Sequence, residues 1–366
     1  LFRSMCRTLE FSRLHPDIQD RGRNKMTANT YRAAGVDLDA ASALKDRIKS
    51  VAGMTLGGHV IGRPGFFAGV YERSPEDNLL MAASADGVGT KIAVGQAAGN
   101  YKGLGMDLVN HCVNDLLTTG ARPAFFLDYI GLGHAEREDA VEIAEGMAEA
   151  CAAAGCVLLG GETAVMPGLY SGDELDVVGF IAGYVERDDL LGSEDAEIGD
   201  VLIGVPSNSP HTNGYSLIRR VFDIDDHPEV LNETEWSPDL GRSLGDALLE
   251  PHRSYLDVLT PVLGKIRGMA HITGGGVFEN IPRSLPEGFG ADLDLSSWEV
   301  PPLFRLIQEQ GNVDRDEMFR VFNMGLGMVL LASADRANEI MDLVPDSWIA
   351  GRVVEREAGL EQVALI

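Results

Sequence analysis

Several short segments of this chain combine glycine with a carboxylate or a cation, and each follows an apolar run. In Asp86 to Lys91 (DGVGTK), Asp86 offers a hard oxygen ligand for Mg²⁺, and Lys91 can neutralise a phosphate. Gly87 and Gly89 let the backbone come close to a ligand, and Thr90 belongs to the same loop. An ordinary turn with a capping aspartate is the competing interpretation, and the residue types alone leave both open.

A second group of polar residues interrupts the apolar run from 104 to 119, namely Asp107, Asn110, His111, Asn114 and Asp115. Asn110 and Asn114 are four residues apart, as are His111 and Asp115, so each pair lies on one helix face. Asn and Asp are poor mid-helix residues, and a solvated face would normally carry Glu or Lys. The pattern indicates a functional face, although His111 taken alone is more typical of a packed or capping histidine.

Two further loops add a carboxylate and an anion site. Glu162 follows an apolar run in GGET (160–163), and with Asp86 and Asp115 it would form a carboxylate cluster of the kind that suits Mg²⁺ bound to nucleotide phosphates. Alone, Glu162 would be a structural cap. The run from Thr273 to Gly276 leads straight into a predicted helix, whose backbone N–H groups and dipole favour a phosphate. His211 lies in a turn, either for proton transfer or simply exposed.

The elements that carry these loops are predicted from the apolar pattern. Strands are expected at 79–84, 124–130, 156–159, 177–185, 201–205, 269–273, 328–332 and 349–355. Helices are expected at 104–119, 136–154, from about 215, 277–285 and 335–344. The alternation predicts two α/β or α+β halves. The acidic segment 186–199 is their expected connection, which gives an N-terminal domain over 26–190 and a C-terminal domain over 191–366.

Charge narrows the choice of partners. The chain has 366 residues, with 30 Lys+Arg against 56 Asp+Glu and a formal net charge of −26. Such a surface repels nucleic acid and anionic lipid, so neither is an expected partner. Scarce lysine beside abundant acids predicts an acidic surface of the halophilic type. No window approaches about 18 uninterrupted apolar residues, so we expect no membrane span and a cytoplasmic protein.

Residues 1–25 differ from the rest, with six basic and three acidic residues and no apolar segment of the secretory type. We expect a disordered or non-native extension ahead of a natural start at Met26. The remaining chain lacks the common phosphate-loop, dinucleotide, zincin and hydrolase-elbow motifs. Its four cysteines contain no C-x-x-C pair, so no zinc site is predicted.

Taken in order, longer motifs resemble the phosphoribosylformylglycinamidine cyclo-ligase (AIR synthetase) family of purine biosynthesis. The resemblance runs from about Tyr31 to the C-terminus. It is carried by YRAAGVDLD (31–39), DGVGTK (86–91), MDLVNHCVND (106–115), FFLDY (125–129), LGGETAVMPG (159–168), PHTNGYS (210–216), HITGGG (271–276), ENIPR (279–283) and FNMGLGM (322–328).

The resemblance implies a two-domain AIR-synthetase-like fold of the α+β or α/β class, whose C-terminal α/β half carries the glycine-rich phosphate loop. It implies a homodimer in which the N-terminal halves pair through a β-barrel-like interface, and an active site in the cleft between the halves. ATP and Mg²⁺ are the implied cofactors, and formylglycinamidine ribonucleotide (FGAM) is the implied substrate. Ring closure would give 5-aminoimidazole ribonucleotide (AIR), ADP and phosphate.

The same resemblance implies roles for individual residues. Mg²⁺ and the ATP phosphates are assigned to Asp86, Asn114, Asp115 and Glu162, with Gly87, Gly89, Thr90 and Lys91 completing the ATP loop. The substrate's ribose 5-phosphate is assigned to Thr273, Gly274, Gly275 and Gly276. The implied catalytic residues are His211, Lys91 and Asp115, and His271 is expected to face the same cleft.

Three departures and two alternatives stay open. The turn over 62–69 has fewer glycines than the family pattern, which leaves its geometry undecided. Ala85 stands where the family commonly has Thr, and Arg32 where it has Lys, so their phosphate contacts are undecided. The first alternative is another ATP-dependent enzyme of the superfamily, of the formylglycinamidine ribonucleotide synthase, thiamine-phosphate kinase or selenophosphate synthase type. The second is a non-catalytic nucleotide-binding subunit. The motifs at 210–216 and 271–283 favour the cyclo-ligase, and the retained carboxylates argue against a silent subunit.

Overall fold

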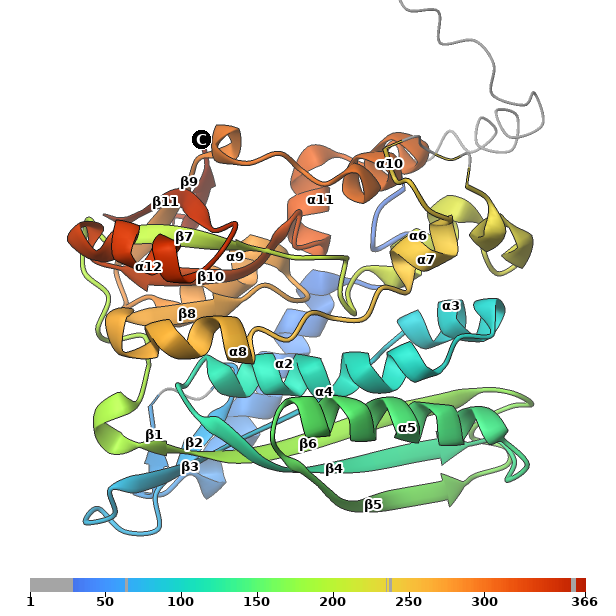
Figure 1. Cartoon of the computed structure of the whole chain (residues 1–366), viewed down its shortest axis with the longest axis horizontal. Coiled ribbons are helices and arrows are strands. Elements are labelled where there is room, and N and C mark those ends of the chain that lie inside the picture. The colour runs from blue at the N-terminus through green and yellow to red at the C-terminus, as the bar shows by residue number, and fades with distance from the viewer. Residues whose placement is uncertain (1–28, 63–64, 235, 237–238, 357–359) are drawn as a thin grey trace, which may run out of the picture.

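The computed structural model describes residues 29–62, 65–234, 236, 239–356 and 360–366. The predicted extension over 1–25 and the predicted start at Met26 lie outside the described residues. Figure 1 shows two halves stacked on one another, each built around a sheet. The chain passes from one sheet to the other through residues 187–200, which begin with the short 3-10 helix η2 (Arg187–Asp189).

The first half holds a six-stranded sheet in the order β1-β2-β3-β6-β4-β5, in which only β4 and β5 pair in parallel. Its elements are α2 (Leu38–Ala52), η1 (Gly53–Thr55), β1 (Val60–Ile61), β2 (Gly69–Tyr71), β3 (Leu79–Gly87), α3 (Lys91–Ala98), α4 (Lys102–Leu117), β4 (Arg122–Leu132), α5 (Glu138–Ala153), β5 (Val157–Val165) and β6 (Leu175–Glu186). The predicted strands are present. However, β3 and β5 continue through Asp86 and Glu162, where the sequence predicts loops.

The two faces of this sheet have different surroundings, because successive residues of a strand point to opposite sides. Along β6, Val177 and Ile181 are buried, whereas Val178 and Phe180 are exposed. Figure 1 shows α4 and α5 lying across one face, and this is the face that Val177 and Ile181 occupy in the core. The opposite face, here called the outer face, therefore presents apolar side chains to the surroundings of the protomer.

The second half holds a six-stranded sheet in the order β12-β9-β11-β7-β10-β8. Its elements are β7 (Val201–Pro206), α6 (Tyr215–Phe222), η3 (Pro228–Asn232), α7 (Leu244–Leu248), α8 (Leu256–Leu259), η4 (Thr260–Lys265), β8 (Gly268–His271), α9 (Gly276–Asn280), η5 (Ile281–Ser284), β9 (Phe289–Leu293), η6 (Leu295–Ser297), α10 (Pro302–Gly311), α11 (Arg315–Val321), β10 (Leu326–Ala332), η7 (Ala334–Arg336), α12 (Ala337–Leu343), β11 (Trp348–Glu355) and β12 (Val363–Leu365). The helix predicted over 277–285 ends early, because Pro282 lacks an N–H donor and the chain tightens into η5.

Helix α4 joins the halves. Leu108 of α4 faces the first sheet, because its side chain lies next to the point that a Cβ atom at Gly179 of β6 would occupy. In the second sheet, Ile203 belongs to the same core as Leu108, whereas Leu202 points to a separate core on the far side of that sheet. The two sheets thus enclose α4, and its polar residues lie between the halves. No helix among the described residues is long and apolar enough to cross a membrane.

Candidate active site

The polar residues of α4 form a row that binds the backbone of an extended segment, residues 250–255, from the second half. Asp107 Oδ1 accepts a hydrogen bond from the His252 N–H at 2.7 Å, and Asn110 Nδ2 donates to the His252 carbonyl at 2.7 Å. From residue 107 to residue 114 the helix rises about 10.5 Å, and from 252 to 255 an extended chain rises about 10 Å. The polar side chains of α4 and the backbone groups that they bind therefore have matching spacing. This face of α4 is therefore a docking surface for the second half.

Asn114 lies at the end of this row and is fully engaged by it. Its Nδ2 donates to the Arg253 carbonyl at 2.8 Å, and its Oδ1 accepts from the Tyr255 N–H at 2.9 Å. Both amide atoms are used and the side chain is buried, so the structure places Asn114 between the halves. The role of Asn114 as a Mg²⁺ ligand stays a prediction, in which Oδ1 would bind the ion beside the Tyr255 N–H.

Lys91 is also buried. It begins α3, and its Nζ lies 2.8 Å from Asp107 Oδ1 and 3.1 Å from the Glu250 carbonyl, to which it donates. Both members of the Lys91–Asp107 pair have no exposed side-chain surface. Burial lowers the pKa of Lys91 against the opposing effect of Asp107, and burial raises the pKa of Asp107 to about 6 in spite of Lys91. In this structure Lys91 joins α3, α4 and segment 250–255, and the predicted phosphate contact would require breaking this pair.

Two carboxylate–histidine pairs lie side by side at the end of β3. Asp86 Oδ2 is 3.0 Å from His111 Nε2, and Asp115 Oδ1 is 2.8 Å from His271 Nδ1. His111 Nδ1 lies 2.8 Å from the hydroxyl of Thr212 in the second half. The structure thus brings the predicted residues Asp86 and Asp115 together, with His111 between them.

Burial and charge act in opposite directions on these groups. Burial would raise the pKa of Asp86, but the nearby His111 lowers it to about 2. Burial would lower the pKa of His111, but Asp86 raises it to about 9. Burial and neighbouring cations lower the pKa of His211 and of His252 well below its usual value. At neutral pH the site therefore holds one imidazolium, at His111, beside neutral His211 and His252.

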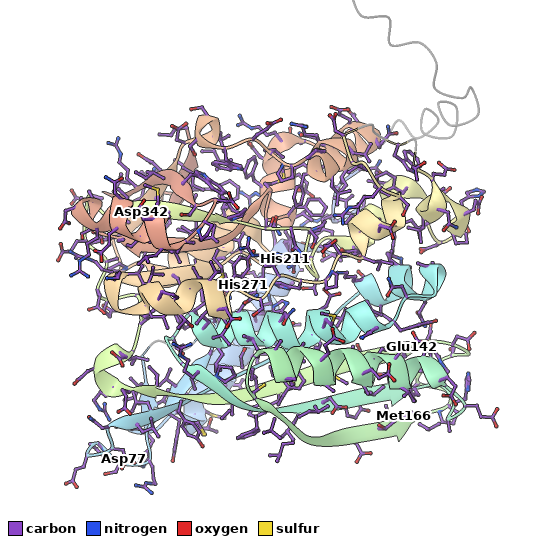
Figure 2. The ribbon with its side chains drawn as sticks, in the orientation of Figure 1. Asp77, Glu142, Met166, His211, His271 and Asp342 are labelled. Atoms are coloured by element: carbon purple, nitrogen blue, oxygen red, sulfur yellow. The ribbon has the colours of Figure 1, made fainter. Side chains whose placement is uncertain are left out.

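Figure 2 shows His211 and His271 at the junction of the two halves. His252 completes this cluster, and its ring stacks on that of His211 with centroids 3.7 Å apart. His211 has no exposed surface, so the alternative of a simple surface histidine is wrong. Sequence reasoning missed His252, because it lies in a segment without a motif or a periodic pattern. Its only signal is a histidine between Pro251 and Arg253.

Glu162 does not join the cluster within one chain. Glu162 lies in β5 and pairs with Tyr129 of β4, and the register places it three strands from Asp86, a separation of about 14 Å. Tyr129 alternates with the buried Ile130 along β4, so Glu162 lies on the outer face, away from α4. The side chain is exposed. The predicted cluster of Asp86, Asp115 and Glu162 is therefore not formed inside a protomer, because strand alternation directs Glu162 to the opposite side.

The glycine turn after β8 starts beside the histidine cluster, two residues beyond His271. Asn280 Nδ2 braces it by donating to the carbonyls of Thr273 at 3.2 Å and Gly276 at 2.8 Å. Gly275 has φ +90°, and a side chain there would meet Glu279. Gly274 is the partly exposed member. The helix that follows, α9, has only five residues, so a phosphate here would depend on the turn's own N–H groups more than on a helix dipole.

The loop that follows Asp86 is the accessible part of the site. Gly89 and Thr90 are exposed, and the Thr90 hydroxyl lies 3.0 Å from that of Ser216 in the second half. The Asp86 side chain is 42% exposed, and its Oδ1 accepts from the Gly87 N–H at 2.7 Å. Mg²⁺ in nucleotide sites is usually held by one or two carboxylates together with phosphate oxygens. Asp86 is a half-buried carboxylate of this kind beside an accessible loop, so its chemistry fits Mg²⁺ bound to ATP.

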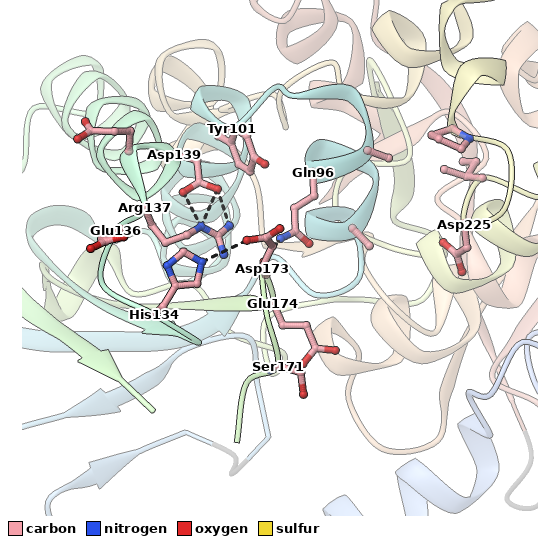
Figure 3. Close-up of a pocket in the computed structure, with 15 residues that line it drawn as sticks. Gln96, Tyr101, His134, Glu136, Arg137, Asp139, Ser171, Asp173, Glu174 and Asp225 are labelled. Carbon is pink, nitrogen blue, oxygen red and sulfur yellow. Dashed lines mark hydrogen bonds and ion pairs between the residues drawn. The ribbon is translucent and has the colours of Figure 1, made fainter. Parts of the chain in front are cut away.

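A separate cavity of about 870 Å³ lies beside α3, between the segment that follows β4 and the segment that precedes β6 (Figure 3). It is lined by Gln96, Tyr101, His134, Arg137 and six acidic residues (Glu136, Glu138, Asp139, Asp173, Glu174 and Asp225). Arg137 pairs with Asp139, and His134 lies 3.2 Å from Asp173. None of the predicted site residues lines this cavity, and its acidity disfavours a free anion.

Comparisons with known proteins agree with this architecture. Residues 67–185 match the family described as AIR synthase related protein, N-terminal domain, and residues 197–362 match the corresponding C-terminal domain. Among solved structures, thiamine monophosphate kinase from Aquifex aeolicus has a TM-score of 0.60 at 17% identity, covering 90% of this chain and 98% of that one. The hydrogenase maturation protein HypE in complex with ATP has a TM-score of 0.57 at 16% identity, covering 81% and 83%. At these identities the likeness concerns the fold.

Curated relatives are much more similar in sequence. The phosphoribosylformylglycinamidine cyclo-ligase of Caldicellulosiruptor bescii is 44% identical over 338 residues, which cover 90% of this chain and 98% of the relative. The enzyme of the same name from Thermoanaerobacter sp. (strain X514) is 42% identical over 335 residues, covering 90% and 99%. The chain therefore belongs to the AIR synthase related family, and it aligns with phosphoribosylformylglycinamidine cyclo-ligases along nearly their whole length.

Proposed function

We propose that this chain catalyses the ATP-dependent closure of FGAM to AIR, with ADP and phosphate as the other products. The observation that carries the proposal is the full-length similarity to cyclo-ligases, which extends over 98% of the relative from C. bescii. The site adds support, because a half-buried carboxylate at the end of β3, just before a glycine loop, meets buried histidines at the junction of the halves. An enzyme that uses ATP to make a purine precursor belongs in the cytoplasm, and we propose that location.

The chemistry needs alignment more than covalent catalysis. A formamide carbonyl is a poor electrophile, and its oxygen is a poor leaving group. Transfer of the γ-phosphoryl group of ATP to that oxygen makes it part of a phosphate. The amidine nitrogen then attacks the same carbon, the carbon–oxygen bond breaks, phosphate leaves and the nitrogen loses a proton. Holding both partners in reacting geometry supplies most of the acceleration in such a transfer.

The residues divide these tasks. Asp86 would hold Mg²⁺, which when bound neutralises charge on the phosphate groups. Gly87 and Gly89 allow close approach of the loop to ATP. Burial lowers the pKa of His211 well below its usual value, so the ring is neutral and would orient the amidine nitrogen by a hydrogen bond more readily than it would hold the released proton. The turn from Thr273 to Gly276 would bind the ribose 5-phosphate through backbone N–H groups.

We further propose a homodimer formed through the outer face of the first sheet. Met81, Phe180 and Tyr184 are exposed on this face by 37%, 40% and 42%, and Met81 pairs directly with Tyr184 across β3 and β6. Leu159, on β5, is also exposed. A contiguous apolar face of this kind on a soluble protomer marks an interaction surface. Glu162 lies on the same face, so a second copy of this chain docked there would lie close to it.

The proposal is tested with the purified chain, ATP, Mg²⁺ and a panel of acceptors. FGAM should yield an aminoimidazole product with one ADP per ring closed, and thiamine monophosphate should not be phosphorylated. Asp86→Asn should lose turnover with its fold preserved, whereas the control Asp342→Asn, on exposed α12 and far from the site (Figure 2), should retain it. ATP consumption without the aminoimidazole, or phosphorylation of thiamine monophosphate, would assign a different activity. Full turnover in Asp86→Asn would remove the metal role of Asp86.

A further inference from the structure

His252 occupies the centre of the histidine cluster. It is 1% exposed, and it reaches the cluster on the extended segment that α4 binds. Its ring stacks on His211 with centroids 3.7 Å apart and an interplanar angle of 11°. Its Nε2 lies 3.1 Å from His271 Nε2. One side chain thus contacts both of the histidines that the sequence places in the cleft.

The backbone of His252 is fixed independently of its ring. The N–H is bound by Asp107, and the carbonyl by Asn110. Asn114 Nδ2 lies 3.1 Å from the ring's Nε2. Because α4 holds the residue at three points, the position of the ring is set by the first half, whereas His211 and His271 both belong to the second half. His252 therefore connects α4 to the two histidines.

His211 needs such support. Its φ of +60° lies in the left-handed region, which is unfavourable for a residue with a side chain. A conformation of this kind persists only where surrounding contacts enforce it, and such residues concentrate at functional sites. The Ser209 hydroxyl accepts the His211 N–H at 3.1 Å, which fixes the backbone. The stack with His252 fixes the ring.

The three histidines do not form a metal site in this arrangement, although their nitrogens lie within 4.8 Å of one another. An imidazole nitrogen presents its lone pair in the plane of its ring. Two parallel rings in a stack therefore cannot direct their nitrogens at one ion. The Nδ1 atoms of His211 and His252 have no hydrogen-bond partner among the described residues, as expected for rings held by stacking.

We propose that His252 is a positioning residue for ring closure, holding His211 by stacking and His271 through Nε2 when the halves are docked. The inference rests on the proposed function. It predicts that His252→Phe, which keeps the stack but loses the Nε2 contact, and His252→Gln, which keeps a polar end but loses the stack, each reduce turnover. A misplacement of about 1 Å can cost as much as about a hundredfold in rate, so we expect at least about a tenfold fall in kcat.

Steady-state kinetics with ATP and FGAM varied separately, alongside thermal unfolding, give the first test. We expect kcat to fall in both variants, with the KM for ATP within about twofold of wild type and the unfolding midpoint within a few degrees. The matched control is His227→Gln, an exposed histidine at the start of η3, which should change none of these values. Wild-type kcat in both folded variants, or a kcat that falls only in proportion to the folded fraction, would overturn the proposal.

A second readout does not depend on activity. The chain has eight histidines, so ¹⁵N-histidine labelling can resolve their ring signals. In His252→Phe, the ring signals of His211 and His271 should shift while that of His227 does not. Unchanged signals for His211 and His271 would contradict the inference even if the chain had a different activity. If wild type fails to make AIR while these signals shift, the proposed function is wrong, and what stands is the positioning of His211 and His271 by His252, without a role in ring closure.

Discussion

Replacing Lys91 by methionine separates the structural role seen here from the phosphate contact implied by the resemblance. Lys91 and Asp107 are fully buried, and Nζ lies 2.8 and 2.7 Å from the two carboxylate oxygens. Removing one member of a buried pair leaves a buried charge and costs about 3–5 kcal/mol. At about 2–4 °C per kcal/mol, the thermal midpoint should fall by about 6–20 °C. The measurement is thermal unfolding at pH 8, with KM for ATP on the folded fraction.

The pH dependence follows from the pKa of Asp107, which burial raises to about 6 against the pull of Lys91. A carboxyl whose folded pKa is raised favours its protonated form in the folded state, so its contribution to stability is full below pH 4 and is lost as pH rises through 6. At pH 5 most of the carboxyl is already neutral, and removing Lys91 leaves no charge behind. The destabilisation by Lys91→Met should therefore be much smaller at pH 5 than at pH 8.

A second substitution provides the control. Asp107→Asn in the Lys91→Met background removes the buried charge but keeps an oxygen for the His252 N–H, so it should recover most of the lost stability at pH 8. An unchanged midpoint in Lys91→Met, together with a raised KM for ATP, would refute this reasoning. That result would return Lys91 to the phosphate role.

Two further predictions concern packing and assembly. A Cβ atom at Gly146 would lie 1.9 Å from the Lys102 carbonyl oxygen, so Gly146→Ala should force α5 away from α4. We expect the free energy of unfolding, measured with urea, to fall by about 2–4 kcal/mol. A fall below about 0.5 kcal/mol would contradict the close contact. Phe180→Glu places a charge on the exposed outer face of the first sheet. Light scattering should then show a monomer where wild type is a dimer, and the circular dichroism spectrum should be unchanged. A wild-type protein that is itself a monomer would contradict the proposed interface.

The sequence was sufficient for the central strands, for the helices α4, α5 and α12, and for the order of the loops. Apolar runs locate the strands, and the unusual Asn and Asp residues of α4 mark a face that the structure uses. Asp86, Asp115, His211 and His271 are correctly expected near one another. These successes depend on local composition, which strand ends and helix faces express directly.

What α4 binds was beyond sequence reasoning. Its polar residues bind backbone groups of residues 252–255, and every non-proline residue offers those groups, so segment 250–255 carries no signature. The face of the first sheet on which Glu162 lies could not be predicted from the sequence either. Its face depends on the register between β4 and β5, which shifts between Phe126 and Leu127, and a shift of one residue moves a side chain to the opposite face.

The most direct test of the central claim follows the formyl oxygen of FGAM. If the site activates that oxygen by phosphorylation, FGAM labelled there with ¹⁸O should give one ¹⁸O atom in phosphate for each AIR formed by wild type. Asp86→Asn should form neither product. Label recovered in water, or AIR formed without labelled phosphate, would contradict the mechanism proposed for this site.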